Sequence, residues 1–199
     1  MKKIVIVLVL IWVSSLCWGQ KDGKMWFMGV PVEGTVENFE KGLAKKWNVD
    51  KPQSIRTDAQ WATKSYVGNV DWYNNDVACV RVTYNPTLNL VWLVSLEFEN
   101  DGVYEITWIG ALKRFNYFKQ MLKEKYPEVV PKNPGDYKCK YREDIDEDDF
   151  PYARWSFNEG LIVLSVEKAV GAGFGPGVEA YRVKIEVISN AGRKAALGQ

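Results

Sequence analysis

The densest group of side chains that could do chemistry is a run of acids at residues 143–149, which holds six carboxylates in seven positions. Within it, Asp144, Asp146 and Asp148 have the alternate spacing by which calcium loops bring carboxylates onto one ion. Such a loop also requires glycine at its sixth position and glutamate at its twelfth. This chain has aspartate and tryptophan there. The run is therefore a weak calcium candidate, and a solvated acidic loop is the preferred interpretation.

A second segment with chemical potential is the glycine-rich stretch at residues 171–177, which contains four glycines, Phe174 and Pro176. It has no Gly-Lys-Ser/Thr ending, and the proline removes one of the backbone N–H groups that a phosphate loop needs. The pattern predicts a long hairpin tip rather than a nucleotide site. This tip is either a plain surface loop or a recognition hairpin that presents Phe174.

Histidine is absent from the chain. This excludes Ser-His-Asp and Cys-His catalysis, and it excludes zinc or haem held by histidine. The carboxylate, lysine, tyrosine, serine and cysteine side chains that remain form no catalytic motif. We therefore expect no enzyme activity and no cofactor, with a hydrolase that uses a carboxylate pair as the alternative.

The first nineteen residues predict a secretory signal peptide, because Lys2 and Lys3 precede an apolar run at residues 4–13 and Gly19 supplies a small residue for cleavage. The rival is lipidation of Cys17, for which bulky Leu16 stands where a small residue is required. An uncleaved leader that anchors the chain is a further alternative. We expect a soluble exported protein, periplasmic or extracellular, without stable membrane insertion after cleavage.

Removal of the leader takes away two lysines and no acid, so the formal net charge changes from +1 to −1. A chain without excess positive charge gives no expectation of nucleic-acid binding. Cys79 and Cys139 remain, in a compartment where a disulfide can persist. They either form a bridge or stay as two separate buried thiols.

Two amphipathic helices are predicted, at residues 35–47 and 108–126, with Thr35 and Thr107 as N-caps. Short strands follow each helix. In the first half they are expected at residues 54–58, 63–72, 76–84 and 90–98, and in the second half at residues 136–142, 152–157, 160–168 and 178–188. The end of the chain, residues 191–199, is expected to fray.

The strands alternate between an apolar and a polar face, which is typical of an antiparallel sheet covered on one side. In the run from Trp92 to Phe98, the apolar face is expected to carry Trp92, Val94, Leu96 and Phe98. The opposite face is expected to expose a set of charged side chains: Arg81, Glu97, Arg182, Lys184 and Glu186.

The two halves repeat the same order, and several residues align at nearly constant offsets. Phe39, Leu43 and Trp47 precede Phe118, Leu122 and Tyr126 by 79 residues, and Leu96 precedes Ile185 by 89. We predict an α+β fold of two tandem units at residues 20–102 and 103–199, each a helix followed by a three- or four-stranded antiparallel meander, packed as one globular domain. Chance alignment of aromatic residues is the alternative.

Seven tryptophans remain after leader removal. Most have the phase of core positions, so packing is the expected role. Trp26 and Trp61 lie outside the clear patterns and are the candidates for exposed rings at a binding site.

The segment from Phe27 to Thr35 has the pattern F-x-G-V-P-x-x-G-T and leads into Phe39 and Leu43. It resembles the mature N-terminus of a group of small exported bacterial proteins of unknown function, so the resemblance implies no activity. The tandem helix-plus-sheet layout is similar to the beta-lactamase-inhibitor-protein architecture. That resemblance implies a concave sheet face but transfers no contact residues, and the cysteine framework of that protein is missing.

Together these features predict a non-catalytic exported binding module. Its partner would be a protein or another component of the cell envelope, bound at the polar sheet face or at the loops. Inhibition of an extracytoplasmic enzyme through Phe174 is the alternative, followed by the carboxylate-dependent hydrolase.

Overall fold

The structure is a computed structural model of the 199-residue chain. It describes residues 19–47, 52, 54–57, 60–70, 76–98, 107–132, 150–169 and 180–198. Three expected segments lie outside these residues: residues 1–18 of the leader expected at 1–19, the strand expected at 136–142, and the glycine-rich stretch at 171–177. Within the described ranges, no helix is long and apolar enough to cross a bilayer.

A small antiparallel sheet opens the described chain, with three strands: β1 (Gly19–Lys21), β2 (Lys24–Phe27) and β3 (Val30–Pro31). Two tight turns connect them. Asp22 and Gly23 have φ of 52° and 71°, and Met28 and Gly29 have φ of 48° and 76°. Two successive positive φ values are the signature of a type I′ hairpin turn. The F-x-G-V-P pattern is therefore a two-residue hairpin turn, with glycine at its second central position.

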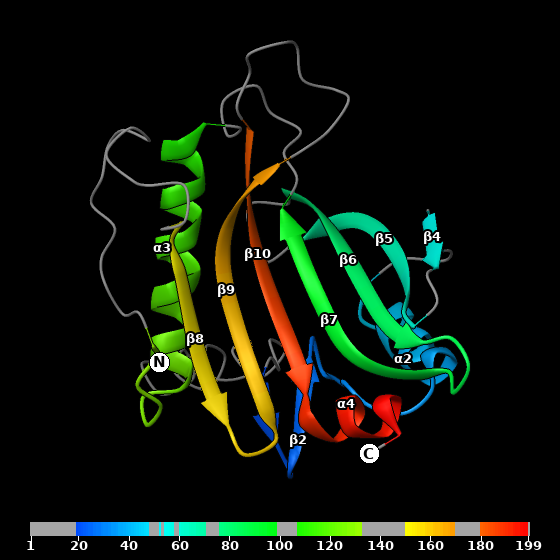
Figure 1. The fold of residues 1–199 in the computed structure, drawn as a ribbon. Coiled ribbons are helices and arrows are strands. Elements are labelled where there is room, and N and C mark those ends of the chain that lie inside the picture. Colours follow the sequence, from blue (N-terminus) through cyan, green and yellow to red (C-terminus); the bar gives the residue numbers. More distant parts are fainter. Residues whose placement is uncertain are drawn as a thin grey trace, which may run out of the picture.

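The main architectural element is a seven-stranded antiparallel sheet with strand order β4-β5-β6-β7-β10-β9-β8 (Figure 1). Its strands are β4 (Ser54–Thr57), β5 (Ala62–Val70), β6 (Asp76–Asn85), β7 (Leu90–Phe98), β8 (Tyr152–Phe157), β9 (Gly160–Ala169) and β10 (Ala180–Ser189). The last strand in sequence, β10, lies between β7 and β9, so strands of both halves form one sheet. The predicted α+β class with antiparallel strands is confirmed.

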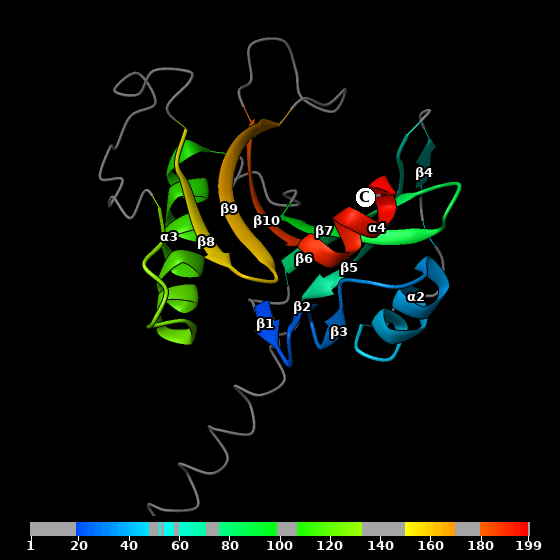
Figure 2. The ribbon, with the colours of Figure 1, turned by 60° about the horizontal axis from the view of Figure 1, so that its bottom comes forward.

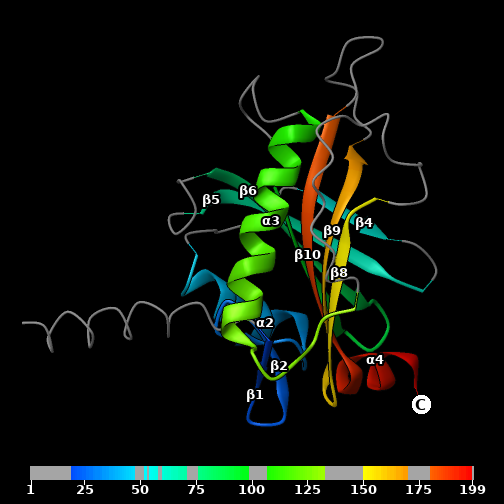
Figure 3. The same cartoon turned by 90° about the vertical axis from the view of Figure 1, so that its left-hand side faces the viewer.

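The two predicted helices are present as α2 (Val36–Ala44) and α3 (Trp108–Lys125). Each begins after the predicted threonine, whose hydroxyl accepts a hydrogen bond from the backbone N–H three residues later. The helix α2 precedes β4 to β7, and α3 precedes β8 to β10. Both helices and the small sheet cover the same face of the large sheet (Figures 2 and 3).

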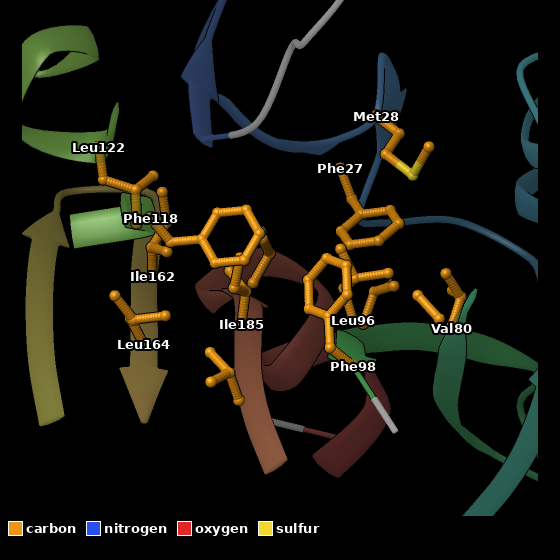
Figure 4. Close-up of a cluster of buried hydrophobic side chains, with 14 of the residues drawn as sticks. Phe27, Met28, Val80, Leu96, Phe98, Phe118, Leu122, Ile162, Leu164 and Ile185 are labelled. Atoms are coloured by element: carbon orange, nitrogen blue, oxygen red, sulfur yellow. The ribbon is translucent and has the colours of Figure 1, made fainter. Parts of the chain in front are cut away.

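The core lies between that face and the elements that cover it. One row of paired residues crosses six strands and is buried throughout: Tyr66, Val80, Leu96, Ile185, Leu164 and Ala153. Figure 4 shows Phe118 and Leu122 of α3 above β9, and Phe27 of the small sheet close to Phe98. The rings of Phe98 and Phe118 are stacked, with centroids 5.0 Å apart. The large sheet and α3 therefore share one continuous apolar layer.

Polar contacts attach α2 and the residues after it to the sheet. The Tyr66 hydroxyl donates a hydrogen bond to the carboxylate of Glu40, and Lys64 Nζ lies 2.7 Å from the same oxygen. Burial is the main cause that raises the pKa of Tyr66, and the hydrogen bond to Glu40 and its negative charge raise it further. Trp47 Nε1 donates to the backbone oxygen of Asn69 at 2.7 Å.

The expectation that residues 191–199 fray is wrong, because a third helix, α4 (Asn190–Leu197), follows β10 directly. The Ser189 hydroxyl accepts a hydrogen bond from Gly192 N at 3.0 Å and caps the helix. Gly192 and Ala196 are buried, and Asn85 Nδ2 donates to the oxygen of Ala196 at 2.7 Å. Small side chains let α4 pack closely against β7. Close packing of small residues therefore orders a segment whose one large apolar residue, Leu197, is exposed.

Candidate functional site

The face of the large sheet opposite the core carries an open cavity of about 520 Å³, lined by side chains of β5, β6, β7 and β10. Nine of the eleven lining residues are polar or charged, and the exceptions are Trp92 and Leu93. All four lining strands lie in the interior of the sheet, and β5 has β4 as its outer neighbour. The backbone below the cavity is therefore held by hydrogen bonds on both sides of each strand.

Six charged side chains form one connected set on this face, which we call the charge network: Arg81, Glu97, Glu167, Arg182, Lys184 and Glu186. Five of them are the residues that the alternation pattern places on the polar face. The sixth is Glu167, from β9. The network joins β6, β7, β9 and β10.

The centre of the charge network is Glu97, and its exposure differs from the prediction. The side chain was expected to be exposed, but the residue is only 2% exposed. Its Oε2 lies 3.0 Å from Arg81 Nε and 3.2 Å from Arg182 Nη1, and Ser95 Oγ donates to Oε1 at 3.2 Å. Two guanidinium groups and a hydroxyl thus stabilise the buried charge and cover it, whereas Arg81 and Arg182 keep part of their surface in solvent.

The remaining acids of the charge network hold the cations of β10. Arg182 Nη2 lies 3.1 Å from Glu167 Oε2, and Lys184 Nζ lies 2.8 Å from Glu186 Oε1. Burial works to lower the pKa of Lys184, but the hydrogen bond to Glu186 and the charges of Glu186, Glu167 and Glu97 outweigh it, so this pKa is raised. Lys184 is therefore a cation at any physiological pH.

The apolar end of the cavity results from a β-bulge. The register between β6 and β7 shifts between Thr83 and Tyr84, which leaves one extra residue on β7. As a result Trp92 and Leu93, although adjacent in sequence, both line the cavity. A bulge breaks the two-residue alternation of a strand and redirects a side chain in this way.

The bulge corrects the predicted orientation of Trp92, which was assigned to the apolar face together with Val94. Val94 is fully buried in the core, but Trp92 is half-buried on the polar face. The ring of Trp61 packs against that of Trp92, with centroids 5.0 Å apart and planes at 54°. Sequence reasoning named Trp61 as a binding candidate and missed Trp92.

The other predicted site residues are not brought to this cavity by the described structure. Trp26 is half-buried on β2 of the small sheet, on the other side of the large sheet. Cys79 is buried on β6, in register with Glu97, while Cys139 lies outside the described residues. Phe174 and the calcium candidates Asp144, Asp146 and Asp148 lie outside them too. Among the described residues, no group of three or more acids or cysteines is arranged to hold a metal ion.

Comparison of the chain with protein-family models, with curated proteins and with solved structures found no match in any of the three.

Proposed function

We propose that the protein is an exported, non-catalytic binding module whose binding site is the polar face of the seven-stranded sheet. The observation that carries this proposal is the carboxylate of Glu97, which is buried at the cavity between Arg81 and Arg182. Buried charges stabilise a fold only weakly, and an apolar core at the same place would do so at least as well. A fixed network of charges at an open cavity is better explained by recognition.

The preorganisation of the cavity supports the proposal. Ion pairs and hydrogen bonds fix the side chains of the charge network, and the interior strands of the sheet fix their backbone. Side chains that are already immobilised lose little conformational entropy when a ligand binds. A rigid polar surface of this kind is suited to selective binding of one ligand.

The ion pairs formed by the acids of the charge network favour binding over catalysis. A glycosidase or related hydrolase needs two carboxyl groups that flank the scissile bond, one of which supplies a proton. Here Glu97, Glu167 and Glu186 are each engaged with a guanidinium or ammonium group of the charge network. No observation favours the alternative of enzyme inhibition through Phe174, which lies outside the described residues.

The proposal includes cleavage of a signal peptide after Gly19 and a soluble product in the periplasm or outside the cell.

It also includes the origin of the fold from two tandem units at residues 20–102 and 103–199. The offset of 89 residues aligns Leu96 with Ile185, and these two residues are directly paired across β7 and β10. If β7 and β10 are equivalent strands of the two units, a local twofold axis between them pairs each residue on the axis with its own equivalent, as Leu96 is paired with Ile185.

The proposed binding face can be tested by photo-crosslinking in envelope fractions. A photoreactive amino acid with a short aliphatic diazirine side chain, small enough to leave the cavity open, would replace Thr83, which lines the cavity, or Lys113, which is exposed on α3 at the opposite face. We expect an adduct of defined mass from the Thr83 position and none from the Lys113 position. Adducts from Lys113 only, or from neither position, would contradict the assignment of the polar face.

A further inference from the structure

We propose that the cavity on the polar face binds a neutral saccharide, with one sugar ring against Trp92 and its hydroxyl groups on the charge network. This inference rests on the proposed binding function at the same cavity and adds the chemical class of the ligand. It follows from the charge balance of the cavity, from its apolar end, and from the hydroxyl groups that line it.

The charge balance argues against an ionic ligand. The charge network contains three cations and three acids, and each cation lies within 3.5 Å of at least one acid. Five of these residues line the cavity, and Glu167 pairs with Arg182 and Lys184 from outside the lining. A network with no net charge does not attract an anion or a cation over a distance, and an ionic ligand would have to compete with ion pairs already formed. A neutral ligand with many hydroxyl groups can instead donate to the carboxylates and accept from the guanidinium groups without breaking those pairs.

The apolar end of the cavity provides a surface for the C–H face of a sugar ring. The bulge places Trp92 there, and Trp61 packs against it. The indole Nε1 of Trp92 is buried and has no acceptor among the described residues, so the ring offers apolar surface rather than a hydrogen-bond donor. An aromatic ring beside convergent polar groups is the usual composition of a site that orients an amphipathic small ligand.

Hydroxyl groups line the side of the cavity that β5 and β6 form. Thr63 and Thr83 face each other with their hydroxyls 3.3 Å apart, and Ser65 lies next to them on β5. Each hydroxyl can both donate and accept, so it can adapt to the hydroxyls of a sugar in either direction. A volume of about 520 Å³ also lies in the range of small-ligand sites, which is roughly 300–1,000 Å³.

The placement of the charges argues against a protein as the ligand of this cavity. The fully buried centre of a protein interface is depleted of charged side chains, which occupy its solvated rim. Here the charge network occupies the middle of the face, with the apolar residues at one end. A protein that covered this face would desolvate the whole network, whereas a saccharide would leave its charges in contact with hydroxyl groups and water.

The test uses the mature protein and an array of neutral oligosaccharides built from glucose, galactose, mannose and N-acetylglucosamine, with uronic-acid and sialylated glycans as charged counterparts. Glycans that bind on the array would be titrated by calorimetry and by tryptophan fluorescence. We expect at least one neutral glycan to bind, and Trp92→Ala to weaken that binding by at least about tenfold. Trp26→Ala is the matched control, because it removes a half-buried tryptophan on the other side of the sheet.

A second variant keeps the inference testable if Trp92→Ala fails to fold. Ser65→Gln adds volume inside the cavity without changing its charge, and it should weaken binding to a similar degree. Preference for a charged glycan, or full binding by Ser65→Gln, would overturn the inference. If no neutral glycan binds while Thr83 still crosslinks to a protein, the saccharide is wrong and the proposed binding face stands. If neither result appears, both proposals fail.

Discussion

The indole ring of Trp47 lies directly over Gly68 on β5, so that a methyl group on this glycine would be 2.8 Å from Cε2 and Cζ2 of the ring. Trp47 follows α2, and it is 7% exposed. The contact holds the residues that follow α2 against β5. How closely they pack can be tested by substitution of Gly68.

Gly68→Ala is expected to destabilise the protein by roughly 1–3 kcal/mol, because the added methyl group must displace the Trp47 ring. The measurement is the free energy of unfolding in urea. In a Trp47→Phe background the same substitution should cost much less, since the smaller ring leaves space above residue 68. If Gly68→Ala lowers the free energy of unfolding equally in both backgrounds, contact with the Trp47 ring is not what excludes a side chain at residue 68.

Glu97→Gln is expected to lower the free energy of unfolding by about 2 kcal/mol, because it removes the charge shared by Arg81 and Arg182. Glu186→Gln is the matched control, and it should cost less because Lys184 keeps Glu167 as a partner at 3.5 Å. Chemical denaturation of both variants gives the comparison. A larger loss for Glu186→Gln would show that Glu97 is not the centre of the network.

The raised pKa of Tyr66 predicts that stability falls as the pH rises above about 10. There the phenol of the unfolded chain ionises while the buried phenol keeps its proton, so the folded state binds more protons. The slope from this one group is at most about 1.4 kcal/mol per pH unit. The raised pKa of Lys184 acts in the same direction above about pH 10.5, because its folded form also retains a proton longer.

Tyr66→Phe should therefore flatten the fall in unfolding free energy above about pH 10, and Glu40→Gln should flatten it in part by removing the negative charge beside the phenol while keeping an acceptor oxygen. Tyr117→Phe controls for the loss of an exposed hydroxyl on α3. The readout is the urea midpoint between pH 8 and pH 12. An unchanged slope in Tyr66→Phe would contradict the assignment.

Gly192→Ala should destabilise the protein, although the same change in an ordinary exposed helix stabilises by about 1 kcal/mol. A methyl group at this position would lie 2.5 Å from the oxygen of Val91 and 3.1 Å from the α-carbon of Trp92. We expect faster hydrogen exchange across α4 and a lower urea midpoint. Ala195→Gly is the control, since residue 195 is exposed and only intrinsic helix propensity changes there. A rise in the midpoint for Gly192→Ala would contradict close packing of α4.

Local patterns predicted much of the fold. Thr35 and Thr107 marked the helix starts correctly, because an N-cap depends on residues close in sequence. The alternation in β10 identified its buried face, since every second residue from Tyr181 to Val187 is buried. The α+β class follows from these elements alone.

Two features that the sequence patterns did not predict depend on residues distant in the chain. Two others had local signals that could have been read. The orientation of Trp92 is set by the pairing of β7 with β6, which no alternation pattern records. The burial of Glu97 depends on Arg182, 85 residues away in the sequence. The Asp22-Gly23 pair was a readable signal for a type I′ hairpin, and the alanines after Ser189 were a readable signal for α4.

The position of β10 has a consequence for how the protein is made. Synthesis runs from the N-terminus, so β7 and β9 each lack one neighbouring strand until residues 180–189 have emerged. The sheet is therefore completed only when residues 180–189 have left the ribosome. A chain that stops before Ala180 loses the strand that joins the two groups of strands rather than a dispensable tail. Formation of the seven-stranded sheet therefore waits for β10.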